Sequence, residues 1–249
     1  MIKFFRRIRQ QLLTDNKFSK YLFYAIGEIV LVVIGILIAL QLNNWNDTVK
    51  ERSVEIKILK EILRNLEHDL IEIRSDIASM DSVNKASEDI NRFMITDSFP
   101  SERFYYDVAK FRVNPHFDPN KSGYNLLVSK GVEIILNDSL RESLSLLYES
   151  LYPYYYRYEE ERTQFKLQEI NPSLLKYFEW HARPELTFFG HYRIGSKDYA
   201  IIKKDADFTK LLYAIAFDNT LVQNRAHRVE NGIESLSFEI EKELKIKID

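Results

Sequence analysis

Residues 21–42 form an apolar run that constrains this chain more than any other feature. The run, YLFYAIGEIVLVVIGILIALQL, contains one formal charge, at Glu28, and is uninterrupted from Ile29 to Leu40. A helix of this length spans about 33 Å, which matches a hydrocarbon core of roughly 30 Å. Aromatic residues flank it, as at membrane interfaces: Tyr21, Phe23, Tyr24 and Trp45. The alternative is a buried helix of a soluble core. We predict an uncleaved signal anchor, because the run is too long for a signal peptide.

The basic residues around the run predict its orientation. Six Lys and Arg residues precede it within residues 1–20, and four lie in the 20 residues from Asn43. Cytoplasmic flanks are enriched in Lys and Arg, so we expect a cytoplasmic N-terminus and an extracytoplasmic domain over residues 43–249. Residues 1–20 also place apolar residues at helical spacing beside Arg6, Arg7 and Arg9. This pattern predicts a basic amphipathic segment on the inner leaflet; the alternative is a basic flank with incidental apolar residues.

Glu28 is the residue of the span that most invites a functional interpretation. It shares one helical face with Gly35 and Ala39 and follows Gly27. A small-x-x-x-small pair lets two membrane helices approach closely, so we expect Gly27, Gly35 and Ala39 at a helix–helix contact. An ionisable group inside a membrane usually faces protein, and Glu28 is therefore a candidate titrating group. The alternative is that it lies near the inner headgroups, or stays protonated in an oligomer.

A repeat in steps of four and three continues beyond the run. It is unbroken over Leu59, Leu63, Leu66, Leu70, Ile73, Ile77 and Met80. Such a repeat keeps one helical stripe facing a partner, so we predict a single helix from the membrane to about residue 94. The seam over residues 42–80 can pack between copies as a coiled coil or within one copy. We favour packing within the chain, because the segment 208–244 carries a second apolar stripe that needs a partner.

The remaining sequence predicts an all-α bundle of long helices. We expect short helices near residues 104–111 and 124–130, the second ending at Gly131. A capping box from Ser139 to Glu142 predicts the start of a long helix, which Pro153 should kink or divide. Another short helix should begin near Asn171. Residues 183–205 are expected to form a small irregular segment or hairpin.

Tyrosines cluster around Pro153. Tyr152, Tyr154, Tyr155 and Tyr156 can form a recognition surface, because tyrosine offers a large contact area with few rotatable bonds. The alternative is that these rings pack a kinked helix and expose only their hydroxyls.

Catalytic and metal-binding motifs are not evident. The chain has no cysteine, and its five histidines lack the spacing of a helical metal site, although His181 and His191 could converge with Glu179 if the chain folds back. We therefore expect no enzyme activity, no cofactor and no metal. The net charge of −2 also gives no reason to expect nucleic-acid binding.

Two blocks resemble a known family. The first comprises MIKFFRRIRQQLL and NKFSKYLFYAIGEIVLVVIGILIALQLNNWN within residues 1–47, and the second is SGYNLLVSKGVEIILNDSLRESLSLLYE at residues 122–149. They resemble an uncharacterised family, a domain of unknown function, of single-pass inner-membrane proteins from Bacteroidetes, especially marine flavobacteria. The resemblance implies a Gram-negative inner membrane and supplies no activity or site residues.

Three functions are compatible with these features. The first is a membrane-anchored periplasmic scaffold or interaction protein that is homo-oligomeric through Gly35 and Ala39. The second is a subunit of an energised inner-membrane complex, with a multi-span partner and Glu28 as the titrating group; it rests on an analogy of architecture with motor stators. The third is a ligand-sensing helical domain that signals through another protein.

Overall fold

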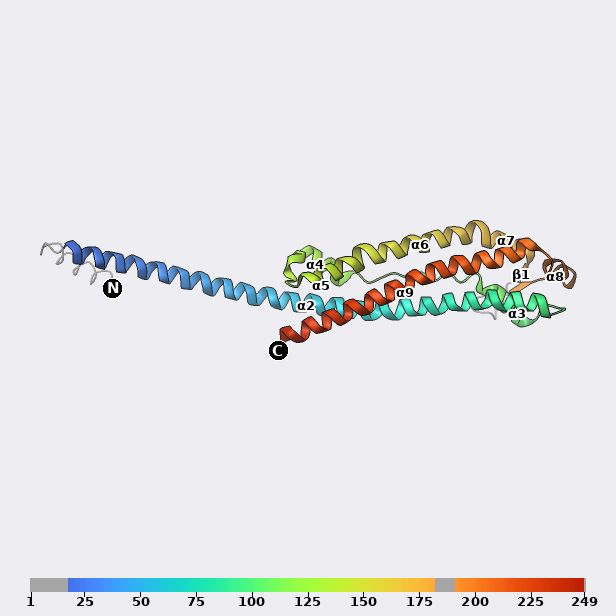
Figure 1. Ribbon diagram of the computed structural model, residues 1–249, viewed down its shortest axis with the longest axis horizontal. Helices are drawn as coiled ribbons and strands as arrows, with labels where there is room; N and C mark the ends of the chain where they lie inside the picture. The colour runs from blue at the N-terminus through green and yellow to red at the C-terminus, as the bar shows by residue number, and fades with distance from the viewer. Residues whose placement is uncertain (1–17, 182–190, 249) are drawn as a thin grey trace. The chain divides into compact units, whose positions relative to one another are not determined.

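The computed structural model describes residues 18–181 and 191–248, which are almost entirely helical (Figure 1). Two short strands form the one sheet in these residues. The predicted all-α class is confirmed. Contacts divide the chain into two units, Met1–Glu55 and Ile56–Asp249. The basic segment with Arg6, Arg7 and Arg9 lies outside the described residues.

Helix α2 runs without a break from Phe18 to Thr96, as the repeat predicted. The first proline after it is Pro100, so nothing in the sequence removes a backbone donor along its length. In the first unit, every large apolar side chain from Ile29 to Leu40 is exposed. Among the described residues, α2 is the one helix long and apolar enough to cross a membrane. Its 18-residue window has a mean hydropathy of 2.6, and none of that window is buried.

In the second unit, α2 pairs with α9 (Ala206–Ile248) in antiparallel orientation. Ser87 Oγ donates to Leu212 O at 3.0 Å, whereas Arg74 reaches Glu230 at 2.8 Å, so numbering falls along α9 as it rises along α2. The two predicted stripes meet in one core. From Ile56 onwards the seam therefore packs within the chain, as we favoured. The buried residues that α9 contributes to this core are Val222, Ala226, Val229, Ile233, Leu236, Ile240 and Leu244.

A third helical column runs from Asp138 to Tyr177 beside α9 (Figure 1). It consists of α5 (Asp138–Ser145), η2 (Leu146–Leu151), α6 (Tyr152–Phe165), η3 (Lys166–Ile170) and α7 (Asn171–Tyr177). Segments η2 and η3 are π-helical.

The π-helical segments explain how this column accommodates two prolines. Pro153 and Pro172 each follow one such segment closely. A proline ring clashes with the carbonyl four residues earlier, which here belongs to the widened turn. The Tyr152 N–H accordingly bonds Leu147 O, five residues back. Of the two predicted outcomes at Pro153, a kink or a division, the helical column is not divided, because the extra residue in the turn makes room for the ring.

In the sequence, two short helices come between α2 and the third column. They are α3 (Glu102–Lys110) and α4 (Ser122–Lys130), followed by the 3-10 turn η1 (Val132–Ile134). Both short helices were predicted, and Gly131 ends α4 with a φ of 95°, a value that favours glycine. The cap of α5 differs from the prediction. Asn137, not Ser139, accepts from the Leu140 N–H, because the helix begins at Asp138.

The region after α7 contains two paired strands, in agreement with the hairpin alternative, and a short helix that was not predicted. Strands β1 (Glu179–His181) and β2 (His191–Arg193) pair antiparallel and place His181 opposite His191. Helix α8 (Ser196–Ile202) then occupies part of the segment expected to be irregular. Its buried Tyr199 and Ile202 explain the helix, since they pack into a second core beneath α3 and α7.

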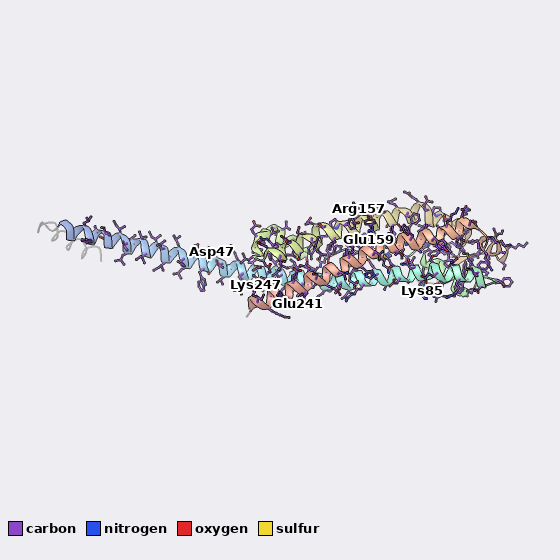
Figure 2. All side chains as sticks on the ribbon, viewed as in Figure 1. Asp47, Lys85, Arg157, Glu159, Glu241 and Lys247 are labelled. Carbon is purple, nitrogen blue, oxygen red and sulfur yellow. The ribbon has the colours of Figure 1, made fainter. Side chains whose placement is uncertain are left out.

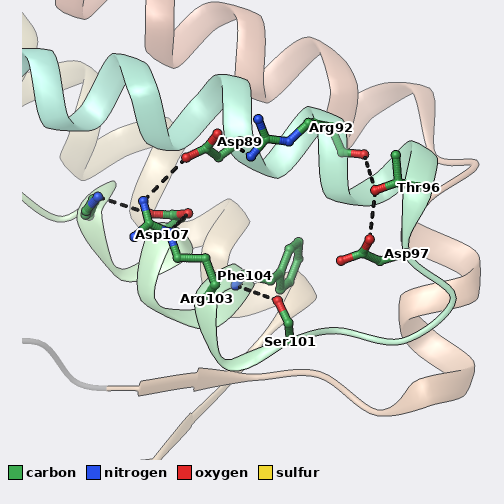
Figure 3. A network of polar contacts seen from close by, with 9 residues as sticks. Asp89, Arg92, Thr96, Asp97, Ser101, Arg103, Phe104 and Asp107 are labelled. Atoms are coloured by element: carbon green, nitrogen blue, oxygen red, sulfur yellow. Dashed lines mark hydrogen bonds and ion pairs between the residues drawn. The ribbon is translucent and has the colours of Figure 1, made fainter.

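A polar network joins α3 to the end of α2 (Figure 3). Ser101 caps α3 by accepting from the Phe104 N–H at 3.1 Å. Arg103 bridges two buried carboxylates, Asp107 on α3 at 2.8 Å and Asp89 on α2 at 3.4 Å. Both carboxylates are thus paired, which lowers the cost of burying them.

Close packing of α4 against α2 generates a test. A Cβ added to Gly123 would meet the Ile62 backbone nitrogen and the Asn65 Oδ1, each at 2.9 Å. Gly123→Ala should lower the free energy of unfolding by about 1–3 kcal/mol, because relieving the clash requires the backbone of α2 or α4 to move. Urea unfolding of the full chain in mild detergent, followed by circular dichroism, measures the change. Asn125→Ala on the exposed side of α4 is the matched control, expected within about 0.5 kcal/mol of the wild type. An equal effect of both changes would contradict the close packing.

Candidate functional site

The segment 111–121 has no helix or strand along most of its length, yet it passes close to α2 and α6. Pro115 and Pro119 keep it from forming a regular element. Its backbone groups must still find partners where they are buried.

Side chains of α2, α6 and η3 supply those partners. Three carboxylates accept its N–H groups: Asp69 from Asn120 at 2.9 Å, Glu72 from Asp118 at 3.3 Å and Glu159 from Phe117 at 3.0 Å. Two cations donate to its carbonyls, Arg162 to Pro115 O and Lys166 to Val113 O.

Arg162 and Lys166 are both buried, and Arg162 is completely inaccessible to solvent. The guanidinium also donates to Met80 Sδ at 3.1 Å and lies 3.8 Å from Glu159 Oε1. Burial, together with the neighbouring Arg162 charge, lowers the pKa of Lys166 to about 7. The amine can therefore lose its proton near neutral pH.

Two buried carboxyls lie in the same region. Burial, reinforced by Glu72, raises the pKa of Asp76 to about 6, although Arg162 and His116 act in the opposite direction. Burial likewise raises the pKa of Glu159 to about 7, against the effect of the Phe117 N–H and of His116. Figure 2 shows Glu159 on α6, away from the ends of the bundle.

Glu159 lines a pocket of about 330 Å³ between segment 111–121 and the start of α6. The carboxyl is only 1% exposed, whereas Tyr156 is half-exposed at the rim. Three further aromatic residues, all buried, form the walls. The pocket is lined by His116, Phe117, Asp118, Pro119, Lys121, Tyr152, Pro153, Tyr155, Tyr156 and Glu159.

The walls are held by specific contacts. The rings of Phe117 and Tyr152 meet edge to face, with centroids 5.4 Å apart. The Tyr152 hydroxyl donates to Asp69 Oδ2 at 2.8 Å, and this carboxylate also accepts from the Asn120 N–H. At the rim, the His116 ring stands 5.9 Å from that of Tyr156.

The two oxygens of the Glu159 carboxyl differ in their partners. Oε1 accepts from Phe117 and faces Arg162, whereas no group in the described part of the chain donates a hydrogen bond to Oε2. His116 Nδ1 lies 3.5 Å from Oε2. A buried acceptor without a donor costs free energy, and a ligand donor could recover it.

The predicted tyrosine surface is divided between two faces. Tyr152, Tyr155 and Tyr156 line the pocket. Tyr154 instead meets Tyr158 edge to face at 5.0 Å, and the guanidinium of Arg225 on α9 lies 3.7 Å above the Tyr158 ring.

The other predicted residues lie elsewhere. Glu28, Gly27, Gly35 and Ala39 belong to the first unit, and a Cβ at Gly27 or Gly35 would meet no atom within 4 Å. His181 Nε2 lies 3.2 Å from Glu179 Oε2, and the strand register brings His191 opposite. Among the described residues, no group of three His, Asp or Glu side chains could hold a metal.

Another pocket, of about 490 Å³, lies between α7, the two strands and α8. In the sequence, residues 182–190, which the structure does not describe, come between its two strands.

The sequence analysis missed Asp76, His116, Glu159, Arg162 and Lys166. A signal was present along the third column, where Glu159, Arg162 and Lys166 continue the spacing of Tyr148, Tyr152 and Tyr155 in steps of four and three. All six side chains are buried, which marks the three charged ones as members of the core stripe.

The raised pKa of Asp76 predicts how stability depends on pH. The unfolded carboxyl ionises near its ordinary value of 3.8 and the folded one near 6. The folded state therefore binds more protons between these values, and stability falls as pH rises through this window. Asp76→Asn removes the free-energy cost of burying an ionised carboxylate. This variant should therefore be more stable than the wild type at pH 8 by about 1–3 kcal/mol, with little difference at pH 4.

Urea unfolding at both pH values measures this effect. Glu67→Gln, on the exposed side of α2, is the matched control and should not change the pH dependence. A less stable Asp76→Asn variant at pH 8 would mean that the Asp76 charge is net favourable beside Arg162.

The sequence model of one family, described as a family of unknown function (DUF6090), matches residues 28–220. The match includes segment 111–121 and every residue that lines the 330 Å³ pocket. No curated protein and no solved structure matches the chain.

Proposed function

The chain belongs to the DUF6090 family, and we propose that it is a single-span membrane protein whose helical unit acts as a periplasmic scaffold or interaction module. The observation that carries this proposal is the complete exposure of the apolar window in α2. Exposing one large aliphatic side chain to water costs about 1.5–3 kcal/mol relative to burying it. The run from Ile29 to Leu40 requires an apolar environment that no other described part of the chain supplies.

A bilayer is the environment that fits this run best. Its length matches the hydrocarbon core, and its backbone groups are satisfied within the helix. The excess of Lys and Arg in residues 1–20 supports a cytoplasmic N-terminus and a helical unit outside the cytoplasm, at the inner membrane of a Gram-negative cell.

Self-association through the span completes the proposal. The face with Gly35 and Ala39 has space for a second helix, because a Cβ at Gly35 would meet no atom of the described chain. Partner proteins would bind to the helical unit.

The absence of cysteine makes the orientation directly testable. A single cysteine at Lys197, an exposed position on α8, should react with an impermeant thiol reagent once the outer membrane is permeabilised. A cysteine at Gln10 should be protected until the inner membrane is opened. The reverse labelling pattern would place the helical unit in the cytoplasm.

The oligomer can be tested by native mass spectrometry of the complex extracted gently from its membranes. Gly35→Leu should dissociate a homo-oligomer, because the added side chain separates the two backbones. Val33→Leu, on the opposite side of the helix, is the matched control and should leave the mass unchanged.

An unchanged mass in Gly35→Leu would remove this contact from the proposal. A stoichiometric multi-span partner would favour the coupling function, with Glu28 as the residue to substitute first.

A further inference from the structure

We propose that the 330 Å³ pocket beside α6 binds a small organic ammonium group, with Glu159 as its anionic partner and tyrosine rings as its walls. This inference rests on the pocket alone and is independent of the proposed membrane function. It assigns a chemical class of ligand to a site that the family match leaves without a role.

The first support is the orientation of Glu159. Its Oε1 is already held by the Phe117 N–H at 3.0 Å, which fixes the carboxylate against segment 111–121. Its Oε2 accepts no hydrogen bond from the described residues, although the side chain is almost completely buried and lines the pocket. A carboxylate oxygen in this position calls for a donor, and a charged N–H donor forms the stronger bond.

The second support is the aromatic character of the walls. Phe117, Tyr152 and Tyr155 are buried around the carboxyl, and Tyr156 stands at the rim. Aromatic faces attract cations, and the effect grows as the cation loses water. Pro119 and Pro153 add apolar surface for a short hydrocarbon body.

Two cationic side chains of the pocket could favour an anion instead. His116 and Lys121 are both exposed, so their charges are screened by water, and His116 is charged only when protonated. Glu159, by contrast, is almost completely buried, so its negative charge is screened less by water and favours a cation.

Ligand binding should depend on pH through Glu159. Its pKa is raised to about 7, and the groups that face it are Asp76 from α2, His116 from segment 111–121, and Tyr155 and Arg162 from α6. The carboxyl is mostly protonated at pH 6 and mostly ionised at pH 8. Affinity for an ammonium ion should therefore rise severalfold between these values.

The test measures binding of n-butylammonium chloride to the full chain in non-ionic detergent by titration calorimetry. The neutral probe 1-butanol and the anionic probe butyrate have similar size. At pH 8 we expect butylammonium to bind about tenfold more tightly than butanol, from one charge-assisted hydrogen bond. Equal affinity for both probes, a preference for butyrate, or no saturable binding of butylammonium would overturn the proposal.

Variants locate the binding. Glu159→Gln keeps an acceptor for the Phe117 N–H and should abolish both the preference for the ammonium probe and most of the pH dependence. His116→Gln should retain both. A Glu159→Gln variant that folds and keeps the preference would contradict the assignment.

A second variant keeps the test decisive if Glu159→Gln does not fold. Tyr156→Ala removes a half-exposed ring from the rim and should weaken butylammonium binding about threefold. Tyr213→Ala removes an exposed ring on α9, outside the pocket, and should change nothing. Equal affinities in these two variants would exclude the pocket as the binding site.

Discussion

The helical unit depends on the burial of a segment that makes few backbone hydrogen bonds of its own. Segment 111–121 has neither helix nor strand along most of its length, and buried peptide groups must be paired. Carboxylates on α2 and α6 accept its N–H groups, and Arg162 and Lys166 donate to its carbonyls. Charged side chains thus take the place that a neighbouring strand would hold in a sheet. Because desolvation disfavours charge, burial raises the pKa of Glu159 and lowers that of Lys166, although the Phe117 N–H opposes the shift at Glu159.

The pocket follows from this mode of attachment. A segment held by polar contacts at a few positions does not interdigitate as an apolar helix would, so space remains where it crosses the start of α6. The prolines contribute on both sides, since Pro119 keeps the segment irregular and Pro153 follows the π-helical turn η2. The extra residue of the π-helical turn η2 rotates the following side chains about the helix axis. The buried positions of the column therefore change from Leu140, Leu144 and Leu147 to the set that begins at Tyr148.

The sequence could predict those parts of the fold that depend on one helix at a time. The stripe from Leu59 to Met80 and the stripe on α9 are continuous apolar patterns, and each identifies its own buried face. Gly131 ends α4 because a positive φ favours glycine there. The contacts of segment 111–121 could not be predicted in this way, because the pairing of the Phe117 N–H with Glu159 joins residues 42 positions apart. Charged residues on α6 suggest a solvated face unless their spacing is compared with that of the preceding tyrosines.

The repeat on α2 also shows that a periodic pattern identifies a face and not what covers it. The same steps of four and three run from the apolar span through Leu42, Trp45 and Val49 to the stripe that packs on α9. The apolar run from Ile29 to Leu40 is exposed, whereas Leu59 and Leu66 are covered by the chain's own core. Between them, Leu42, Trp45 and Val49 are exposed at 60%, 68% and 50%, so no described residue covers that stretch. One repeat, with Arg52 at one of its positions, therefore meets different environments, and each must be identified from burial in the folded chain.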